Sequence, residues 1–277
     1  METQNKNHSS ELSEFEKTVA SISHLQFDEA LVELKKLSAE IFKELRQETH
    51  TIYEMRYDLK KRTLRFVIEQ YSVFSREAIH MLLDAMIRNY DWPELFKELQ
   101  ENINEEKGKF TKDVPHLEMM RRGYLQDLKI DTDNVDYCCA TSTFIRRMRT
   151  IFNNNDNAFS AGALIAFEGH AIPEFHIIDG IIDAYNSGLS DDTLTKMYIN
   201  GHKDFEIEHE AHLIDSIRPY INENNIGKMC KGFLMVSLSM STWWTQLAVE
   251  VMRMEVESAL EVEVEEFDIH SRFTPQV

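Results

Sequence analysis

The segment GHKDFEIEHEAH, residues 201–212, concentrates three histidines and four acidic residues in twelve positions. On a helix, His202, Glu206 and His209 stand at i, i+4 and i+7, so their side chains project from one stripe. Neutral imidazole and carboxylate are ligands suited to iron, manganese or zinc. His212 is an alternative to His209 as a ligand, with a supporting role beside the site as the other interpretation. A solvated acidic helix with scattered histidines would show the same composition, so a metal site requires further donors.

Two other regions supply such donors. Glu168 lies in GALIAFEGHAIPEF with apolar neighbours on both sides, and an unpaired buried carboxylate either costs several kcal/mol or stays protonated. Its partner is a metal, a tyrosine or an arginine. The segment NINEEKGKFTKDVPHLEMM adds Glu105 and His116 across a loop, although a histidine at a helix start is also an ordinary surface residue. Glu106 is the alternative to Glu105, because adjacent helical carboxylates point about 100° apart and only one is expected to face inward.

The elements that position these residues are helices. The chain has nine glycines and five prolines in 277 residues and no sustained alternation of apolar and polar positions, which predicts an all-α fold. A polar and mobile N-terminus is expected over 1–25, and a helical extension over 26–62 that packs on the bundle or supports a homodimer. One domain is expected over 63–265, with a tail over 266–277. Seven core helices are predicted, over residues 63–90, 93–107, 116–128, 137–152, 158–185, 193–221 and 226–265.

Bulk properties exclude several classes of function. A formal charge of -18 repels phosphate backbones and anionic membrane surfaces, so neither nucleic acid nor a membrane is an expected partner. No run of 18 apolar residues is found, and the segment METQNKNHSSELSEFEK does not have the basic-then-apolar order expected of a secretory signal. Three cysteines without CxxC spacing fit a reducing compartment. We therefore expect a cytoplasmic protein. Nucleotide-binding and serine-hydrolase motifs are also missing from the sequence.

The order of the candidate motifs resembles that of the haem-oxygenase-like di-iron oxidases and oxygenases. In that family the motif E-E-x-G comes first and is followed by a histidine. A glutamate with an Ile-Pro downstream comes next, and the motif H-x-x-x-D/E-x-x-H comes last. The corresponding segments here are EEKGKFTKDVPH, FEGHAIP and HKDFEIEH. His116 precedes Glu168 by 52 positions, and Glu168 precedes His202 by 34. The resemblance covers roughly residues 63–250.

The resemblance implies a seven-helix, haem-oxygenase-like bundle without haem that holds two iron ions. The implied ligands are Glu105, His116, Glu168, His202, Glu206 and His209. In this arrangement His116 and a later histidine bind opposite irons, while Glu168 or Glu105 bridges them. Position 206 is glutamate where many relatives have aspartate. The branch that makes an aminobenzoate from its own tyrosine has a lysine soon after the central glutamate, and EGHAIPEFHIIDG contains none.

The implied activity is an O2-activating, non-haem di-iron oxidase or oxygenase that acts on a small substrate and draws on an external electron donor. An amino acid or amine is the first expected substrate class, through N-oxygenation or oxidative C–C cleavage. A fatty acid decarboxylated to a terminal alkene is the second. Two other classes of protein remain as alternatives: a non-catalytic helical interaction protein, and a hydrolase that uses another divalent metal.

Overall fold

The computed structural model of the chain describes residues 16–109, 111 and 114–272, with side chains described up to residue 260. Within these residues the secondary structure is helical and contains no strand, so the predicted all-α fold is confirmed. Seven helices form the core in the predicted order: α4 (Lys61–Arg88), α5 (Pro93–Glu106), α6 (His116–Gly123), α7 (Cys139–Phe152), α8 (Asn157–Tyr185), α9 (Leu194–Ile217) and α10 (Ile226–Arg272). Each lies within a few residues of its predicted range, except at the C-terminal end of α10.

The N-terminal extension packs on the bundle of its own chain. Residues 16–22 are helical, and α2 (Phe27–Ile41) is followed by two short 3-10 turns, η1 (Lys43–Leu45) and η2 (Gln47–Thr49), and by α3 (Thr51–Met55). Helix α2 contacts α10, and Leu31 and Leu34 are buried. Of the two expected roles for the extension, packing on the bundle is the one that the structure shows. Residues 1–15 of the expected mobile terminus lie outside the described residues.

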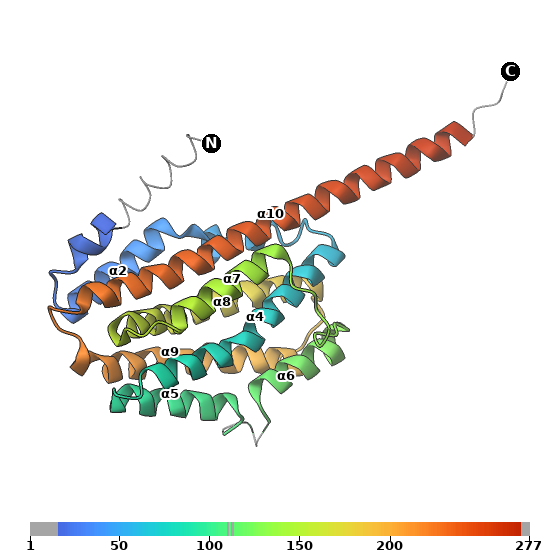
Figure 1. Cartoon of the computed structure of the whole chain (residues 1–277). Coiled ribbons are helices and arrows are strands. Elements are labelled where there is room, and N and C mark those ends of the chain that lie inside the picture. The colour runs from blue at the N-terminus through green and yellow to red at the C-terminus, as the bar shows by residue number, and fades with distance from the viewer. Residues whose placement is uncertain (1–15, 110, 112–113, 273–277) are drawn as a thin grey trace.

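Helix α8 occupies the middle of the bundle, between α10 on one side and α4 and α9 on the other (Figure 1). Its sequence is apolar on nearly all sides, as expected for a helix that is covered all round. The Asp156 side chain accepts a hydrogen bond from the Phe159 amide and caps its first turn. Pro173 lies inside the helix. Because neighbouring helices cover α8 on nearly all sides, a polar side chain on this helix lies deep in the protein.

Two glycines allow α8 and α10 to approach closely. A Cβ atom at Gly162 of α8 would lie 1.9 Å from the backbone oxygen of Met229, and one at Gly232 of α10 would lie 1.9 Å from that of Phe159. No side chain fits at such distances, so the two backbones are in direct contact. This contact holds the helix that carries Glu168 in place.

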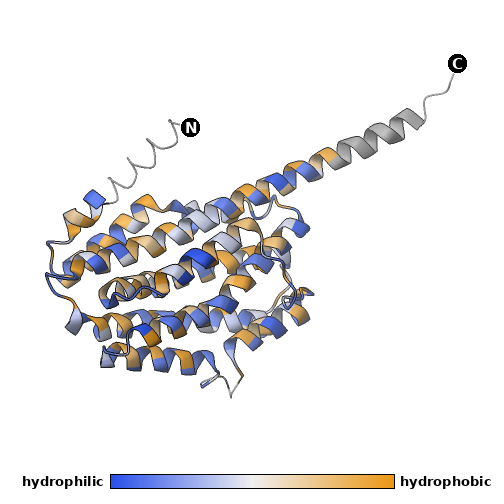
Figure 2. Ribbon diagram, viewed as in Figure 1, coloured by the Kyte–Doolittle hydropathy of each residue, from blue (hydrophilic) through white to orange (hydrophobic). Residues whose placement is uncertain are grey.

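Helix α10 is 47 residues long and continues to Arg272, beyond the predicted end at residue 265. Its C-terminal part projects past the bundle (Figure 1), where hydrophilic and hydrophobic residues alternate along it (Figure 2). Of the expected tail over 266–277, residues 273–277 lie outside the described residues. Among the helices that the structure describes, none combines the length and the apolar character needed to cross a membrane.

Candidate metal centre

One group of possible metal ligands joins three helices. Glu106 is the last residue of α5, His116 the first of α6, and His202 lies in the middle of α9. Their ligand atoms all lie within 4.8 Å of one another. Oε1 of Glu106 is 3.2 Å from Nδ1 of His116 and 3.4 Å from Nε2 of His202. Because α5 ends at Glu106 and α6 begins at His116, these two residues lie close together, although a loop separates them in the sequence.

The orientation of the His202 ring is set by its own helix. Nδ1 of His202 lies 2.8 Å from the backbone oxygen of Tyr198, and since a carbonyl only accepts, this nitrogen is the donor. Nε2 then faces Glu106 and donates to it when the ring is protonated. Once that proton is lost, Nε2 offers its lone pair to a cation, which is the usual arrangement of a metal-binding histidine. Burial lowers the pKa of His202, but the hydrogen bond and charge of Glu106 outweigh it and the net pKa is raised. For Glu106, burial raises the pKa, and the hydrogen bonds with His116 and His202 outweigh it to give a lowered pKa.

A second group consists of Glu168 of α8 and Glu206 and His209 of α9, all buried, with ligand atoms again within 4.8 Å of one another. Burial, followed by the charge of Glu206, raises the pKa of Glu168 well above its usual range. Oε2 of Glu206 is buried and has no hydrogen-bond partner among the described residues. Two carboxyl groups held together away from water, with only a 3.5 Å ion pair between Oε2 of Glu206 and His209, are an arrangement that a further cation stabilises. The donors of this group therefore fit a metal ion.

Glu105 contacts the second group through the imidazole of His209. Its Oε2 lies 2.5 Å from Nε2 of His209, while Nδ1 of His209 lies 3.5 Å from Glu206. Burial lowers the pKa of His209, but Glu206, Glu168 and Glu105 together raise it to about 10. A carboxylate on the far nitrogen of a ligating histidine fixes the ring and increases its basicity. His209 is thus oriented to offer Nδ1 to a cation.

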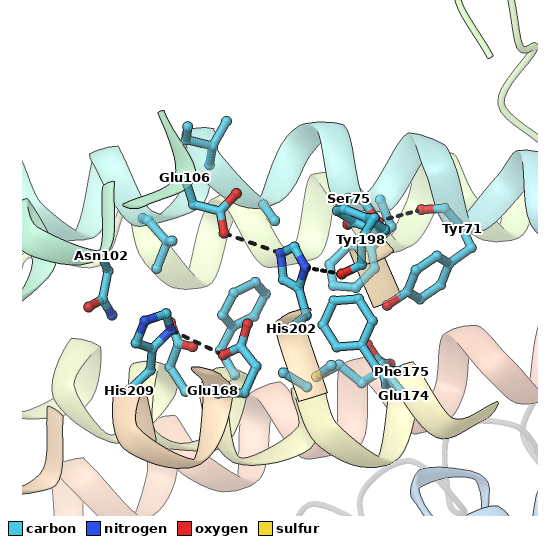
Figure 3. Close-up of a pocket in the computed structure, with 18 residues that line it drawn as sticks. Tyr71, Ser75, Asn102, Glu106, Glu168, Glu174, Phe175, Tyr198, His202 and His209 are labelled. Carbon is cyan, nitrogen blue, oxygen red and sulfur yellow. Dashed lines mark hydrogen bonds and ion pairs between the residues drawn. The ribbon is translucent and has the colours of Figure 1, made fainter. Parts of the chain in front are cut away.

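Both groups border one cavity between α4, α5, α8 and α9, with a volume of about 80 Å³. Figure 3 shows Glu106 and His202 pointing toward each other on one side of it, and His209 and Glu168 on the other. The rest of the lining is mostly aromatic and aliphatic, including Tyr71, Phe74, Phe167, Phe175, Tyr198 and Met240. None of the described lining residues is Lys or Arg. The cavity is therefore apolar apart from the two clusters, Ser75, Asn102 and one further carboxyl group.

That further carboxyl group belongs to Glu174, which lies six residues after Glu168 on α8 and is 2% exposed. Its Oε1 accepts a hydrogen bond from Nε1 of Trp244 at 2.8 Å. Burial raises the pKa of Glu174 to about 8, against the lowering effect of Trp244. The sequence analysis did not single this residue out, although a glutamate inside the apolar α8 segment carries the same signal as Glu168.

The structure brings five of the six sequence-predicted residues into the two groups: His116, Glu168, His202, Glu206 and His209. Glu105 lies outside both, and its alternative Glu106 takes part instead. The expectation that only one of the two faces inward is wrong, because Glu106 meets His116 and His202 while Glu105 meets His209. His212 also lies outside the groups, with a side chain 63% exposed and 3.8 Å from Glu98.

Comparison with known proteins identifies the family. Residues 30–250 match the model of a family described as a domain of unknown function with a solved structure, DUF3865. The chain belongs to the DUF3865 family. The match begins within α2 and covers nearly all of the core helices. The DUF3865 model therefore includes most of the N-terminal extension together with the bundle.

Solved structures resemble this DUF3865 chain over most of its length. A CADD-like protein of unknown function from Nostoc punctiforme is 27% identical, with a TM-score of 0.75 over 80% of this chain and 96% of its own. A second structure with the same description gives 25% identity and a TM-score of 0.74, over 81% and 95%. A TenA homologue from Pyrococcus furiosus shares 16% identity with a TM-score of 0.57, over 78% and 98%, and therefore shows likeness of fold alone. No curated protein matches the chain.

Proposed function

We propose that the protein is a non-haem di-iron oxidase or oxygenase that activates O2 and acts on a small substrate. The observation that carries this proposal is the convergence of two Glu/His groups, from four helices, on one buried cavity. Paired carboxylate and histidine ligands inside a helical bundle are the usual means by which proteins hold two iron ions for reaction with O2. Similarity to CADD-like proteins and the order of the sequence motifs support a haem-oxygenase-like bundle for the fold.

Each group offers ligands for one ion. Glu106, His116 and His202 would hold the first, and Glu168, Glu206 and His209 the second. Two carboxylates and a histidine, or two histidines and a carboxylate, leave coordination positions open in the manner of non-haem iron sites. The ions would supply the electrons for the reduction of O2 to an oxidant. Glu105, held on His209, orients a ligand rather than binding an ion itself.

The lining of the cavity favours a small amine over a fatty acid. A volume of about 80 Å³ has room for only a handful of water molecules, so a small substrate fits it better than a large one. An ammonium group is attracted by aromatic faces such as those of Tyr71 and Phe175, and Glu174 adds a carboxyl group at the same wall. No described lining residue is a cation that would pair with a substrate carboxylate. We therefore place amines ahead of fatty acids, and N-oxygenation or oxidative C–C cleavage ahead of decarboxylation.

The surrounding residues keep water away from the centre. Phe175 packs in T-shaped contacts with Tyr71 and Tyr198. The His202 ring lies 4.7 Å from that of Phe175 and 4.4 Å from that of Tyr198. A water-poor site strengthens the electrostatic interactions within it and limits side reactions of an oxidant. The protein thus provides ligand geometry and exclusion of water, and an external donor would restore the electrons.

The test is oxygen consumption by protein loaded anaerobically with Fe(II), measured with a panel of amines, amino acids and medium-chain fatty acids. The proposal predicts faster oxygen uptake with one or more small amines, and loss of that uptake in His202→Ala. A matched control is His176→Ala, which removes an exposed histidine of α8 outside both groups. Turnover that persists without O2 and reductant would instead indicate a hydrolase, and an absence of bound iron would indicate a non-catalytic bundle.

A further inference from the structure

A second cavity lies between the N-terminal extension and the bundle. It has a volume of about 210 Å³ and is bordered by α2, the turn after it, α8, α9 and α10. Its polar lining residues include Lys35, Ser38, Arg46 and Glu210, and its apolar ones include Leu45 and Phe233. It shares no lining residue with the cavity between the two Glu/His groups. Nothing assigned to the metal centre explains its composition.

Two hydrogen-bond donors in this cavity lack partners. Ser38 is 2% exposed, and its buried Oγ has no hydrogen-bond partner among the described residues. The buried Nε of Arg46 likewise has none. A buried polar group without a partner costs about 1–3 kcal/mol, more if it is charged. Two such donors at one cavity are the mark of a site whose acceptor comes from a ligand.

The charge of the acidic side chain in this cavity, Glu210, is balanced by a lysine, although Oε1 of Glu210 is buried and has no further hydrogen-bond partner among the described residues. Glu210 is held by Lys35, whose Nζ lies 2.8 Å from Oε1. Nε2 of His170 lies 2.8 Å from Oγ of Ser237 and shares a hydrogen bond with it. Since the charges of Lys35 and Glu210 compensate each other, Arg46 leaves the cavity with a net positive charge. The chemistry that the cavity lacks is an anionic acceptor.

We propose that this cavity is a binding site for a small organic carboxylate with a short apolar body. The guanidinium of Arg46 and the hydroxyl of Ser38 would receive the carboxylate, which an arginine recognises through charge-assisted hydrogen bonds. Leu45, Pro173 and Phe233 would contact the apolar part. Inorganic phosphate fits less well, because it has no apolar part and its second charge would face Glu210.

The site stands apart from the metal centre in its chemistry but adjoins it along two helices. Gly169 follows Glu168 on α8, and Glu210 follows His209 on α9. Residues one position apart on a helix point about 100° from each other, so the two cavities lie on different faces of the same helices. The carboxylate site does not depend on the proposed di-iron function, and each can be tested without the other.

The test is calorimetric titration of the full chain, as purified and after loading with Fe(II), with sodium benzoate, sodium butyrate, inorganic phosphate and butylamine. We expect benzoate or butyrate to bind in both preparations, more tightly than phosphate, and butylamine not to bind at this site. Arg46→Gln should weaken carboxylate binding about tenfold or more, and Ser38→Ala several-fold. Lys43→Gln is the matched control: it removes an exposed positive charge three residues away that does not line the cavity, and it should bind as the wild type does.

Circular dichroism and iron content, measured for every variant, separate loss of the site from loss of the fold or of the metal centre. Ser38→Ala removes only an oxygen and keeps the proposal testable if Arg46→Gln does not fold. The proposal is overturned if neither carboxylate binds, if phosphate binds more tightly than both, or if Arg46→Gln and Ser38→Ala bind benzoate as tightly as the wild type. Binding that appears only after iron loading would place the carboxylate at the metal centre and also overturn it.

Discussion

Replacing Glu168 by glutamine should change protein stability in opposite directions without and with iron. In the metal-free protein, burial and the neighbouring Glu206 raise the pKa of Glu168 well above its usual range, which favours its protonated form. In the unfolded chain the same side chain has a pKa of about 4.3 and is ionised at pH 7, so holding the proton in the folded state costs on the order of 3 kcal/mol. Two charges within 4.8 Å of each other would repel by a similar amount, about 3 kcal/mol or more at an effective dielectric constant of 20.

Glutamine removes this cost but must itself be buried, so we expect metal-free Glu168→Gln to be about 2 kcal/mol more stable than the wild type. For a chain of this size that corresponds to an increase in Tm of about 3–4 °C. The sign follows from the raised pKa, because the folded state binds more protons than the unfolded state and stability falls as pH rises above about 4.3. The advantage of the variant should therefore disappear near pH 4.

Iron should reverse this order of stability, so that the wild type becomes more stable than Glu168→Gln. An ion present at a hundred times its Kd stabilises the wild type by about 2.7 kcal/mol, and Glu168→Gln should lose most of this gain. Glu174→Gln is the matched control, since Glu174 lies on the same helix, is equally buried, and has a pKa raised to about 8 by burial. It should stabilise the metal-free protein similarly and keep the full gain with Fe(II).

The assay is thermal unfolding followed by circular dichroism at pH 7 and pH 4, with and without Fe(II) under anaerobic conditions. The reasoning is refuted if Glu168→Gln keeps the iron-dependent gain in Tm, or if the metal-free variant is less stable than the wild type while Glu174→Gln is more stable.

Three further predictions concern single residues. Glu106→Ala should abolish binding of one ion, whereas Glu105→Gln should weaken binding of the other about 10–100-fold through the orientation of His209; equal effects in an iron titration would contradict the difference in role. Gly232→Ala should destabilise the protein by about 3 kcal/mol or more, because its Cβ would meet the backbone of Phe159, and an unchanged urea midpoint would show that α8 and α10 are not in direct contact. Lys196→Met should destabilise the protein by about 2 kcal/mol, because it leaves Asp183 without this buried lysine and Asp179 with Lys203 alone. Unfolding in urea measures the loss, and an unchanged urea midpoint would contradict it.

The sequence predicted the helices well because their apolar periodicity is long and uninterrupted. It also predicted the group within α9, because His202, Glu206 and His209 are related by helical spacing alone. Burial of Glu168 followed from the apolar character of α8 on all its sides. These are the features that depend on one helix at a time.

The choice between Glu105 and Glu106 depends instead on how α5 and α9 are placed relative to each other. Both residues lie at the C-terminal end of α5, and their directions differ by about 100°, so helical spacing alone does not rank them. The structure places both toward α9, one beside His202 and the other beside His209. The cavity at Arg46 was equally beyond prediction, because its lining comes from α2, the turn after it and three core helices.

The most direct test of the di-iron proposal is the iron content of protein loaded anaerobically with Fe(II) and then freed of excess metal. We expect about two iron ions per chain in the wild type, and about one in a variant that lacks either Glu106 or Glu206. Iron content near zero in the wild type, or two ions in both variants, would contradict the proposal.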